Sequence, residues 1–168
     1  MLSCILALLC GVFVLIFDQL TKHYVATNLV LGEVHNFIEG LINIVFVENR
    51  GAAWGIFSGK TIVLLCFTLI AMAVCIAFMV KMGGKSKLLF WSLSLVIVGG
   101  FGNMIDRVFR SGVVVDFLQF DFWQSFPVFN IADCAIVIGG ALMILYLLLD
   151  IISDFYKKKT KQENNEEN

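Results

Sequence analysis

Residues 88–107 read LLFWSLSLVIVGGFGNMIDR, an apolar run that ends in a cluster of polar and charged residues. The apolar part, 88–105, is close to the roughly 20 residues that a helix needs to cross about 30 Å of hydrocarbon. Asn103, Asp106 and Arg107 follow the spacing i, i+3, i+4, so on a helix they share one face. The segment therefore predicts a transmembrane helix with a polar face at one end.

Three other apolar blocks have a similar length, at about 2–17, 62–80 and 131–149. The chain is 60% hydrophobic and 15% charged. A soluble domain averages about half apolar and about a quarter charged residues. We therefore predict an all-α polytopic membrane protein with four transmembrane helices.

The distribution of lysines predicts the orientation of these helices. Basic residues accumulate on the cytoplasmic side of a membrane, and an even number of spans places both termini on the same side. We therefore expect both termini in the cytoplasm, with residues 157–168 forming a polar, disordered tail. The lysines on the predicted inner side are Lys81, Lys85, Lys87, Lys157, Lys158, Lys159 and Lys161.

Two segments then lie outside the membrane, at about 24–60 and 108–130. The stretch 43–48 is rich in β-branched and aromatic residues and is followed by Asn-Arg-Gly, which predicts a strand that ends in a tight turn. A second strand-like run covers 113–118. We expect a small β-rich cradle on the outer face, and a single membrane-embedded domain over residues 1–156. The aromatic residues between 120 and 129 are typical of a belt at the headgroups.

Polar residues recur at helical spacing at the predicted outer ends of the spans. Asp18 and Lys22 are i,i+4, and Asn130 and Asp133 are i,i+3. Asp116 lies in the loop between the last two clusters. A charge at the centre of a membrane helix costs about 2.5–3.5 kcal/mol on insertion scales, and less near the ends. Several such clusters at one depth indicate a shared polar site that faces the interior of the bundle.

Structural explanations for the same residues remain open at this point. Asp18 and Lys22 would serve equally as an interfacial ion pair, and Asp106 would serve as a structural partner of Arg107. Asn130 would serve as a helix N-cap, with the Asp133 carboxylate favoured in the first helical turn.

The glycines of the last two apolar blocks have two readings. They would allow close helix approach, or they would leave room for acyl chains between the helices. These glycines are Gly99, Gly100, Gly102, Gly139 and Gly140.

The remaining side chains exclude several classes of chemistry. His23 and His35 lack zinc-ligand spacing, and the five cysteines show none either. No serine lies in a nucleophile elbow, and no basic stripe indicates a nucleic-acid partner. We therefore expect no metal and no cofactor, and the chemistry that remains is that of carboxylates.

Two carboxylates held close together cannot both ionise, so one keeps its proton while the other stays charged. The ionised group can activate water, and the protonated group can protonate a leaving amine. Asp116 and Asp133 are the best-placed pair, because the loop 117–132 is long enough to fold back and bring them together. Asp18 is a third candidate.

Five short motifs carry a family resemblance. They are DQLTK at 18–22, NRGAAWG at 49–55, GNMIDR at 102–107, VVDF at 114–117 and FNIAD at 129–133. In these motifs, in order and near the expected spacing, the chain resembles the lipoprotein signal peptidase family, also called signal peptidase II. The resemblance covers the whole folded length, and the one departure is the missing basic residue before the first span.

The resemblance implies an aspartic endopeptidase of the bacterial plasma membrane, with its active site at the outer face. Such enzymes remove the signal peptide from prolipoproteins, cleaving just before a cysteine that carries diacylglycerol. The partners implied are these substrates and membrane lipid. The catalytic residues would be Asp116 and Asp133. Supporting or substrate-binding residues would be Asp18, Lys22, Asn49, Gly51, Asn103, Asp106, Arg107 and Asn130.

An alternative is a small proton-coupled transporter subunit that uses the same carboxylates as a relay. A relay predicts polar residues at several depths across the membrane, whereas here they gather at one end. A non-catalytic scaffold is a further alternative, but it would not need five ordered motifs.

Overall fold

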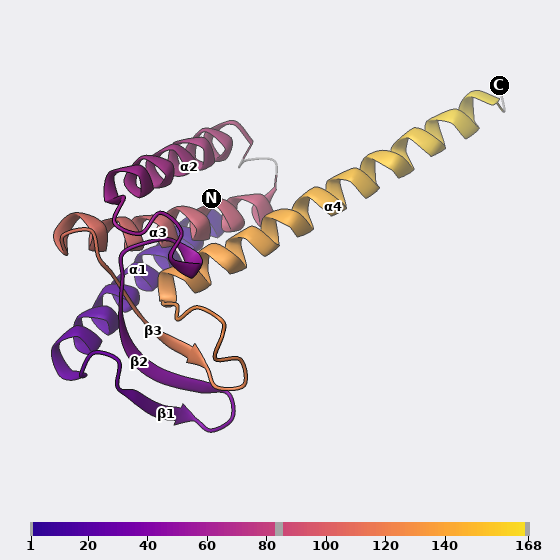
Figure 1. The fold of residues 1–168 in the computed structure, drawn as a ribbon. Coiled ribbons are helices and arrows are strands. Elements are labelled where there is room, and N and C mark those ends of the chain that lie inside the picture. The colour runs from indigo at the N-terminus through magenta and orange to yellow at the C-terminus, as the bar shows by residue number, and fades with distance from the viewer. Residues whose placement is uncertain (1, 83–85, 167–168) are drawn as a thin grey trace.

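The computed structural model describes residues 2–82 and 86–166, which fold into long helices with a small sheet at one end (Figure 1). Within these residues, four helices are long and apolar enough to cross a membrane, as the sequence predicts. The protein is therefore a multi-pass membrane protein. The helices are α1 (Leu2–Asn28), α2 (Thr61–Met82), α3 (Lys87–Phe109) and α4 (Ile131–Glu166).

Helix α3 is the centre of the bundle and packs against α1, α2 and α4. Its contact with α4 is close because small residues face each other there. A Cβ at Gly99 would meet the carbonyl oxygen of Ala132, and a Cβ at Gly139 would lie 2.7 Å from the carbonyl oxygen of Ser92. These glycines bring the helix backbones together. The alternative that they leave room for acyl chains between the helices is wrong for Gly99 and Gly139.

Helix α1 is longer than its apolar block, because it continues from the predicted span through Asn28. The polar side chains of Thr21, Thr27 and Asn28 donate hydrogen bonds to carbonyl groups one turn back, so they do not interrupt the helix. Near the end of the helix, Val25 packs in a small core with the strand residue Val115. Helix α1 therefore continues past residue 24, where the sequence predicts the start of the first outer segment.

The sheet consists of β1 (Val34–Ile38), β2 (Ile42–Asn49) and β3 (Val114–Phe120), antiparallel and in that order. The sequence predicts β2 and β3 but not β1, whose residues are all exposed and show no alternation of burial.

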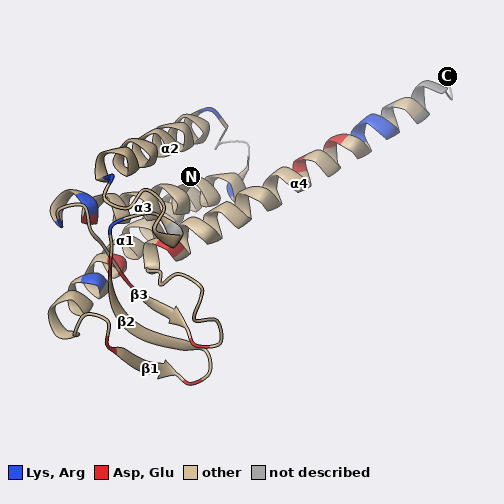
Figure 2. Ribbon diagram, viewed as in Figure 1, with Lys and Arg blue, Asp and Glu red and all other residues tan. Residues whose placement is uncertain are grey.

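The sheet covers the end of the bundle where α1 and α3 end and α4 begins (Figure 1). Figure 2 shows charged residues gathered at this end and along the far part of α4, with few along the spans between them. The helix ends and the sheet thus bring segments that are distant in sequence to a single depth.

At the other end of the molecule, α4 continues as a helix to Glu166. The helix therefore extends through most of the segment that the sequence predicts to be disordered, and Lys and Glu are good helix formers. Residues 167–168, and Lys85 in the predicted inner loop, lie outside the described residues.

Candidate active site

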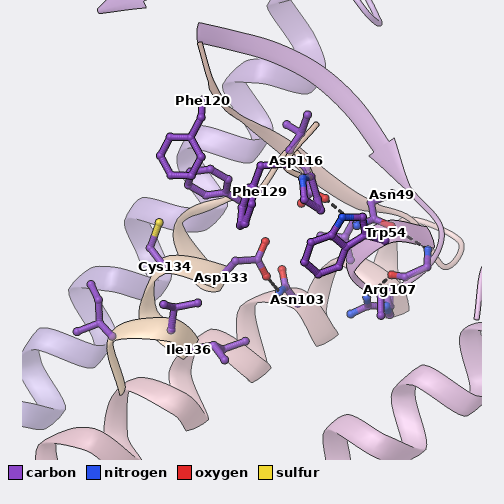
Figure 3. Close-up of a pocket in the computed structure, with 18 residues that line it drawn as sticks. Asn49, Trp54, Asn103, Arg107, Asp116, Phe120, Phe129, Asp133, Cys134 and Ile136 are labelled. Carbon is purple, nitrogen blue, oxygen red and sulfur yellow. Dashed lines mark hydrogen bonds between the residues drawn. The ribbon is translucent and has the colours of Figure 1, made fainter. Parts of the chain in front are cut away.

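The two predicted catalytic aspartates lie on different elements and meet at one cavity. Asp116 is in β3 and Asp133 is in the first turn of α4. Both line a cavity of about 460 Å³, together with Asn49, Asn103 and Arg107 (Figure 3). The fold thus brings together the carboxyl pair that the sequence predicts.

Asp116 is buried, with 2% of its surface exposed, and both of its carboxyl oxygens accept hydrogen bonds. The Asn49 amide donates to Oδ2 at 2.8 Å, and the Asn130 amide donates to Oδ1 at 2.6 Å. Burial, and then the negative charge of Asp133, raise the pKa of Asp116 to about 7, against the lowering effect of these hydrogen bonds and of Lys22. Near neutral pH the carboxyl pair therefore retains a proton.

Asp133 is held by the start of its own helix. Asn130 is the N-cap: its Oδ1 accepts from the Asp133 backbone N–H at 2.9 Å, and its own N–H donates to Asp133 Oδ2 at 3.1 Å. This reciprocal pair is a capping box. The other carboxyl oxygen accepts from the Asn103 amide at 2.7 Å. Helix capping and a place in the site, which the sequence leaves as alternatives, therefore coincide.

Two asparagines connect the aspartates. The Asn130 amide that donates to Asp116 also lies 3.1 Å from Asn103 Oδ1. That oxygen accepts from Lys22 Nζ at 2.9 Å, which leaves the amide nitrogen of Asn103 facing Asp133. A continuous hydrogen-bonded path thus runs from Asp116 through Asn130 and Asn103 to Asp133.

A buried ion cluster centred on Lys22 lies behind the cavity. Lys22 has 0% of its side chain exposed and pairs with Asp18 at 2.9 Å and Asp106 at 3.2 Å. Asp18 accepts from the backbone N–H of Ala132, and Asp106 accepts from that of Val115. Ala132 and Val115 immediately precede Asp133 and Asp116, the two aspartates of the cavity. The cluster therefore holds the backbone on both sides of the site, and the expectation of a simple interfacial pair is wrong.

Asp106 and Arg107 do not form the ion pair that the sequence suggests. Asp106 pairs with Lys22 and, at 3.3 Å, with Arg110. Arg107 instead donates from Nη2 to the Gly51 carbonyl oxygen at 3.0 Å, and its buried Nε has no hydrogen-bond partner among the described residues. Asp106 is thus part of the framework behind the cavity, while Arg107 lines the cavity and connects it to the Gly51 loop.

The predicted site residues therefore form two layers that are linked by hydrogen bonds. The inner layer lines the cavity, and the outer layer lies behind it. Gly51 belongs to the inner layer, because its N–H donates to Asn49 Oδ1 at 2.8 Å and fixes the amide that holds Asp116. The residues that line the cavity are Asn49, Gly51, Asn103, Arg107, Asp116 and Asp133. Those behind it are Asp18, Lys22, Asp106 and Asn130.

The sequence does not predict several residues that lie around the site. Gln19 donates to Asp18 at 3.1 Å and to the Gly102 carbonyl at 3.2 Å, and its one signal is its place inside the first motif. An aromatic wall closes the cavity, with ring centroids 5.0 to 6.0 Å apart. The sequence groups these rings with a headgroup belt, since spacing alone does not reveal which ring turns inward. The wall consists of Phe120, Phe126 and Phe129.

The cavity combines two buried carboxyl groups, of which Asp116 has a pKa of about 7, with apolar walls. Residues 136–138 of α4 add aliphatic side chains to the aromatic wall, and Trp54 also lines the cavity (Figure 3). Among the described residues, no group of three His, Cys, Asp or Glu side chains could hold a metal ion. The arrangement suits general acid–base catalysis on a substrate with apolar parts.

Comparisons with known proteins agree on one family. A family model described as signal peptidase II matches residues 10–149. A lipoprotein signal peptidase of Staphylococcus aureus strain MRSA252 is 41% identical over 145 residues, which is 86% of this chain and 88% of the relative. One of Clostridium acetobutylicum is 44% identical over 133 residues, 79% of this chain and 86% of the relative. A bacterial membrane enzyme solved by the in meso method at 2.3 Å superposes with a TM-score of 0.82 and 40% identity, over 86% of this chain and 88% of that one.

Proposed function

This chain belongs to the signal peptidase II family and removes signal peptides from prolipoproteins, and we propose that it does so as an aspartic endopeptidase through Asp116 and Asp133. One observation carries the proposal. The two carboxyl groups line the same cavity, and every one of their oxygens accepts a hydrogen bond. Carboxyl groups held in this way are preorganised to give and accept protons without moving themselves. Residues 1–156 would form the single peptidase domain.

In the proposed reaction, the ionised carboxylate removes a proton from a water molecule as the water oxygen attacks the scissile carbonyl carbon. The protonated carboxyl gives its proton to the carbonyl oxygen, so a neutral tetrahedral diol forms. The carboxyl that was protonated by water then donates to the amide nitrogen as the C–N bond breaks. The other carboxylate takes a proton from a diol hydroxyl. The products are an acid and an amine, and the pair again holds a single proton.

The surrounding residues support this cycle in two ways. The amides of Asn49, Asn103 and Asn130 hold the carboxyl groups in place while their charges exchange. Arg107, which lines the cavity, would hold the loop beside Asn49 in place through its bond to the Gly51 carbonyl oxygen. The cluster of Asp18, Lys22 and Asp106 would hold the backbone beside both aspartates, and Lys22 would also orient the Asn103 side chain.

The proposed substrate is a prolipoprotein whose cysteine carries diacylglycerol. The apolar wall beside residues 136–138 of α4 would receive its apolar parts, since α4 is one of the helices that crosses the membrane. With both termini in the cytoplasm, the cavity would open at the outer face of the plasma membrane. The transporter alternative is not favoured, because the buried charges gather at one depth.

Substitution of each aspartate tests the catalytic assignment. We expect Asp116→Asn and Asp133→Asn each to lower kcat/KM on a lipidated prolipoprotein peptide by at least about a thousandfold, because asparagine keeps the shape but cannot titrate. Asp154→Asn is the matched control, since this exposed residue of α4 forms an ion pair with Lys157 and does not line the cavity. Turnover by either active-site variant within about tenfold of the parent would contradict the assignment.

A further inference from the structure

A second cavity, of about 350 Å³, adjoins the first. It is lined by residues 47–51 at the end of β2, by the loop that contains the short helix η1 (Ala53–Gly55), and by Pro127 and Val128. Asp116 lines both cavities, whereas Asp133 lines only the first. The two cavities therefore meet at one of the two proposed catalytic residues.

The two cavities differ in the chemistry of their walls. The first is lined mainly by aromatic and aliphatic side chains, whereas the second includes Glu48, Arg50 and Ser58. Arg50 Nη2 lies 3.3 Å from Glu48 Oε2, and the two side chains are 59% and 43% exposed. The second cavity is thus more polar than the first, presents both signs of charge and faces water.

Where β2 lines this cavity, one of its two edges has no strand partner among the described residues. Strand β1 pairs with β2 only from Ile42 to Val45, and a single bridge joins Leu31 to Phe46. Beyond that point, residues 47–49 pair with β3 on one side only. An unpaired strand edge can bind an extended peptide through its main-chain groups.

The position of the scissile bond indicates which part of the substrate would bind in each cavity. That bond must lie at both aspartates, so the substrate has to occupy the first cavity and continue past Asp116. The signal peptide and the acyl chains are apolar and suit the first cavity. The residues after the modified cysteine belong to the mature protein, whose chain extends from the lipid anchor into water, and they suit the second.

On the basis of the proposed function, we propose that the second cavity binds the first residues of the mature lipoprotein, those that follow the modified cysteine, and that Glu48 and Arg50 read their charge. An exposed ion pair of this kind is weak, so a charged substrate side chain can displace either partner. The intact pair therefore accepts both signs of charge. Removal of one partner leaves a single charge and creates a preference.

Competition between two peptides tests this inference. Both are lipidated prolipoprotein peptides, identical except for Glu or Lys at the second position after the cysteine, and the readout is the ratio of their kcat/KM values. We expect Arg50→Gln to shift the ratio toward the Lys peptide by about threefold, and Glu48→Gln to shift it toward the Glu peptide by a similar factor. Lys60→Gln and Glu39→Gln are the controls, because they remove exposed charges of the same signs outside the cavity.

The ratio is taken within one preparation, so a loss of folded enzyme lowers both rates and leaves it unchanged. Equal ratios in the parent and both variants would overturn the inference, as would equal shifts in the control variants. The proposed function fails in a different way, through cleavage of both peptides by Asp116→Asn. The two failures are therefore distinguishable.

Discussion

At the scale of single residues, the raised pKa of Asp116 defines the pH range in which the pair can work. Burial and the charge of Asp133 bring this pKa to about 7, so the proton that the pair needs is lost as the pH rises through that value. We expect kcat/KM to fall above about pH 7, and also to fall in acid where both groups are protonated. A pH profile from 4.5 to 9 on the lipidated peptide measures both limbs. A rate that stays constant from pH 6 to 9 would contradict a proton shared near neutrality.

The same pKa also has a consequence for stability that needs no substrate. The folded protein keeps a proton on Asp116 that the unfolded chain releases above about 4, so stability declines as the pH rises from about 4 to about 7. Asp116→Asn removes this dependence. The thermal midpoint of the variant, relative to the parent, should therefore be higher at pH 8 than at pH 5. This comparison is independent of catalysis and checks the cause of the alkaline limb.

The sequence predicts the position of some site residues but not the partners of others, because these partners depend on the direction in which each side chain points. The carboxyl pair follows from the exclusion of other chemistries, and Asn130 follows from its position before a helix. Asp106 and Arg107 are different, because adjacent residues of a helix point about 100° apart. One therefore faces α1 and the other faces the loop at Gly51. Their separate partners depend on how the helices are rotated, which the motif does not specify.

At the scale of elements, the close contact of α3 and α4 predicts the effect of a single methyl group. Gly99→Ala would press against the Ala132 carbonyl and the Ile136 side chain, whereas a Cβ at Gly140 meets nothing within 4 Å. We expect Gly99→Ala to lower stability by about 1–3 kcal/mol. It should also lower kcat/KM, since Ala132 precedes Asp133. Gly140→Ala is the control and should change stability by less than about 0.5 kcal/mol.

The two variants are compared by their thermal unfolding midpoints in detergent and then by their activity at a temperature at which both are folded. Equal midpoints for the two variants would show that α3 and α4 do not depend on this contact.

The ends of the helices are harder to predict from the sequence than the number of helices. Block length gave the spans, because hydrocarbon thickness fixes how many apolar residues are needed. It did not give the extension of α1 to Asn28, since Val25 is fixed by contact with a strand that lies far away in the sequence. Strand β1 was missed because all its residues are exposed, so burial imposed no alternation on them. Tertiary contacts, rather than local pattern, set these limits.

At the scale of the whole molecule, the distribution of lysines predicts which face of the membrane holds the site. We expect reporter fusions after Glu39 and Gln119 to report an extracytoplasmic location, and fusions after Gly84 and Gln162 to report the cytoplasm. Gly84 lies outside the described residues, whereas Gln119 belongs to the strand that carries Asp116. An extracytoplasmic signal after Gly84 would place the cavity on the wrong face for a lipoprotein substrate.

The position of the cavity beside membrane-spanning helices also predicts a preference for lipidated substrate. Acyl chains and a signal helix confine the substrate to the depth of the aspartates, so the encounter is almost intramolecular. We expect the diacylglyceryl form to be cleaved with a kcat/KM at least about a hundredfold above that of the unmodified form. Purified protein in mixed micelles with matched peptides gives the comparison. Equal rates would show that the lipid is not recognised, even if both aspartates prove catalytic.

The Lys22 cluster has a consequence for the order in which the protein is made. Asp18 and Lys22 lie on the first helix to leave the ribosome, but Asp18 needs the N–H group of Ala132 on the last. A nascent chain that has inserted only α1 to α3 lacks both that N–H group and Asp133. If Asp133 is catalytic, as we propose, each newly made molecule should stay inactive until α4 has entered the bilayer, and proteolysis would begin only after the last membrane helix has been made.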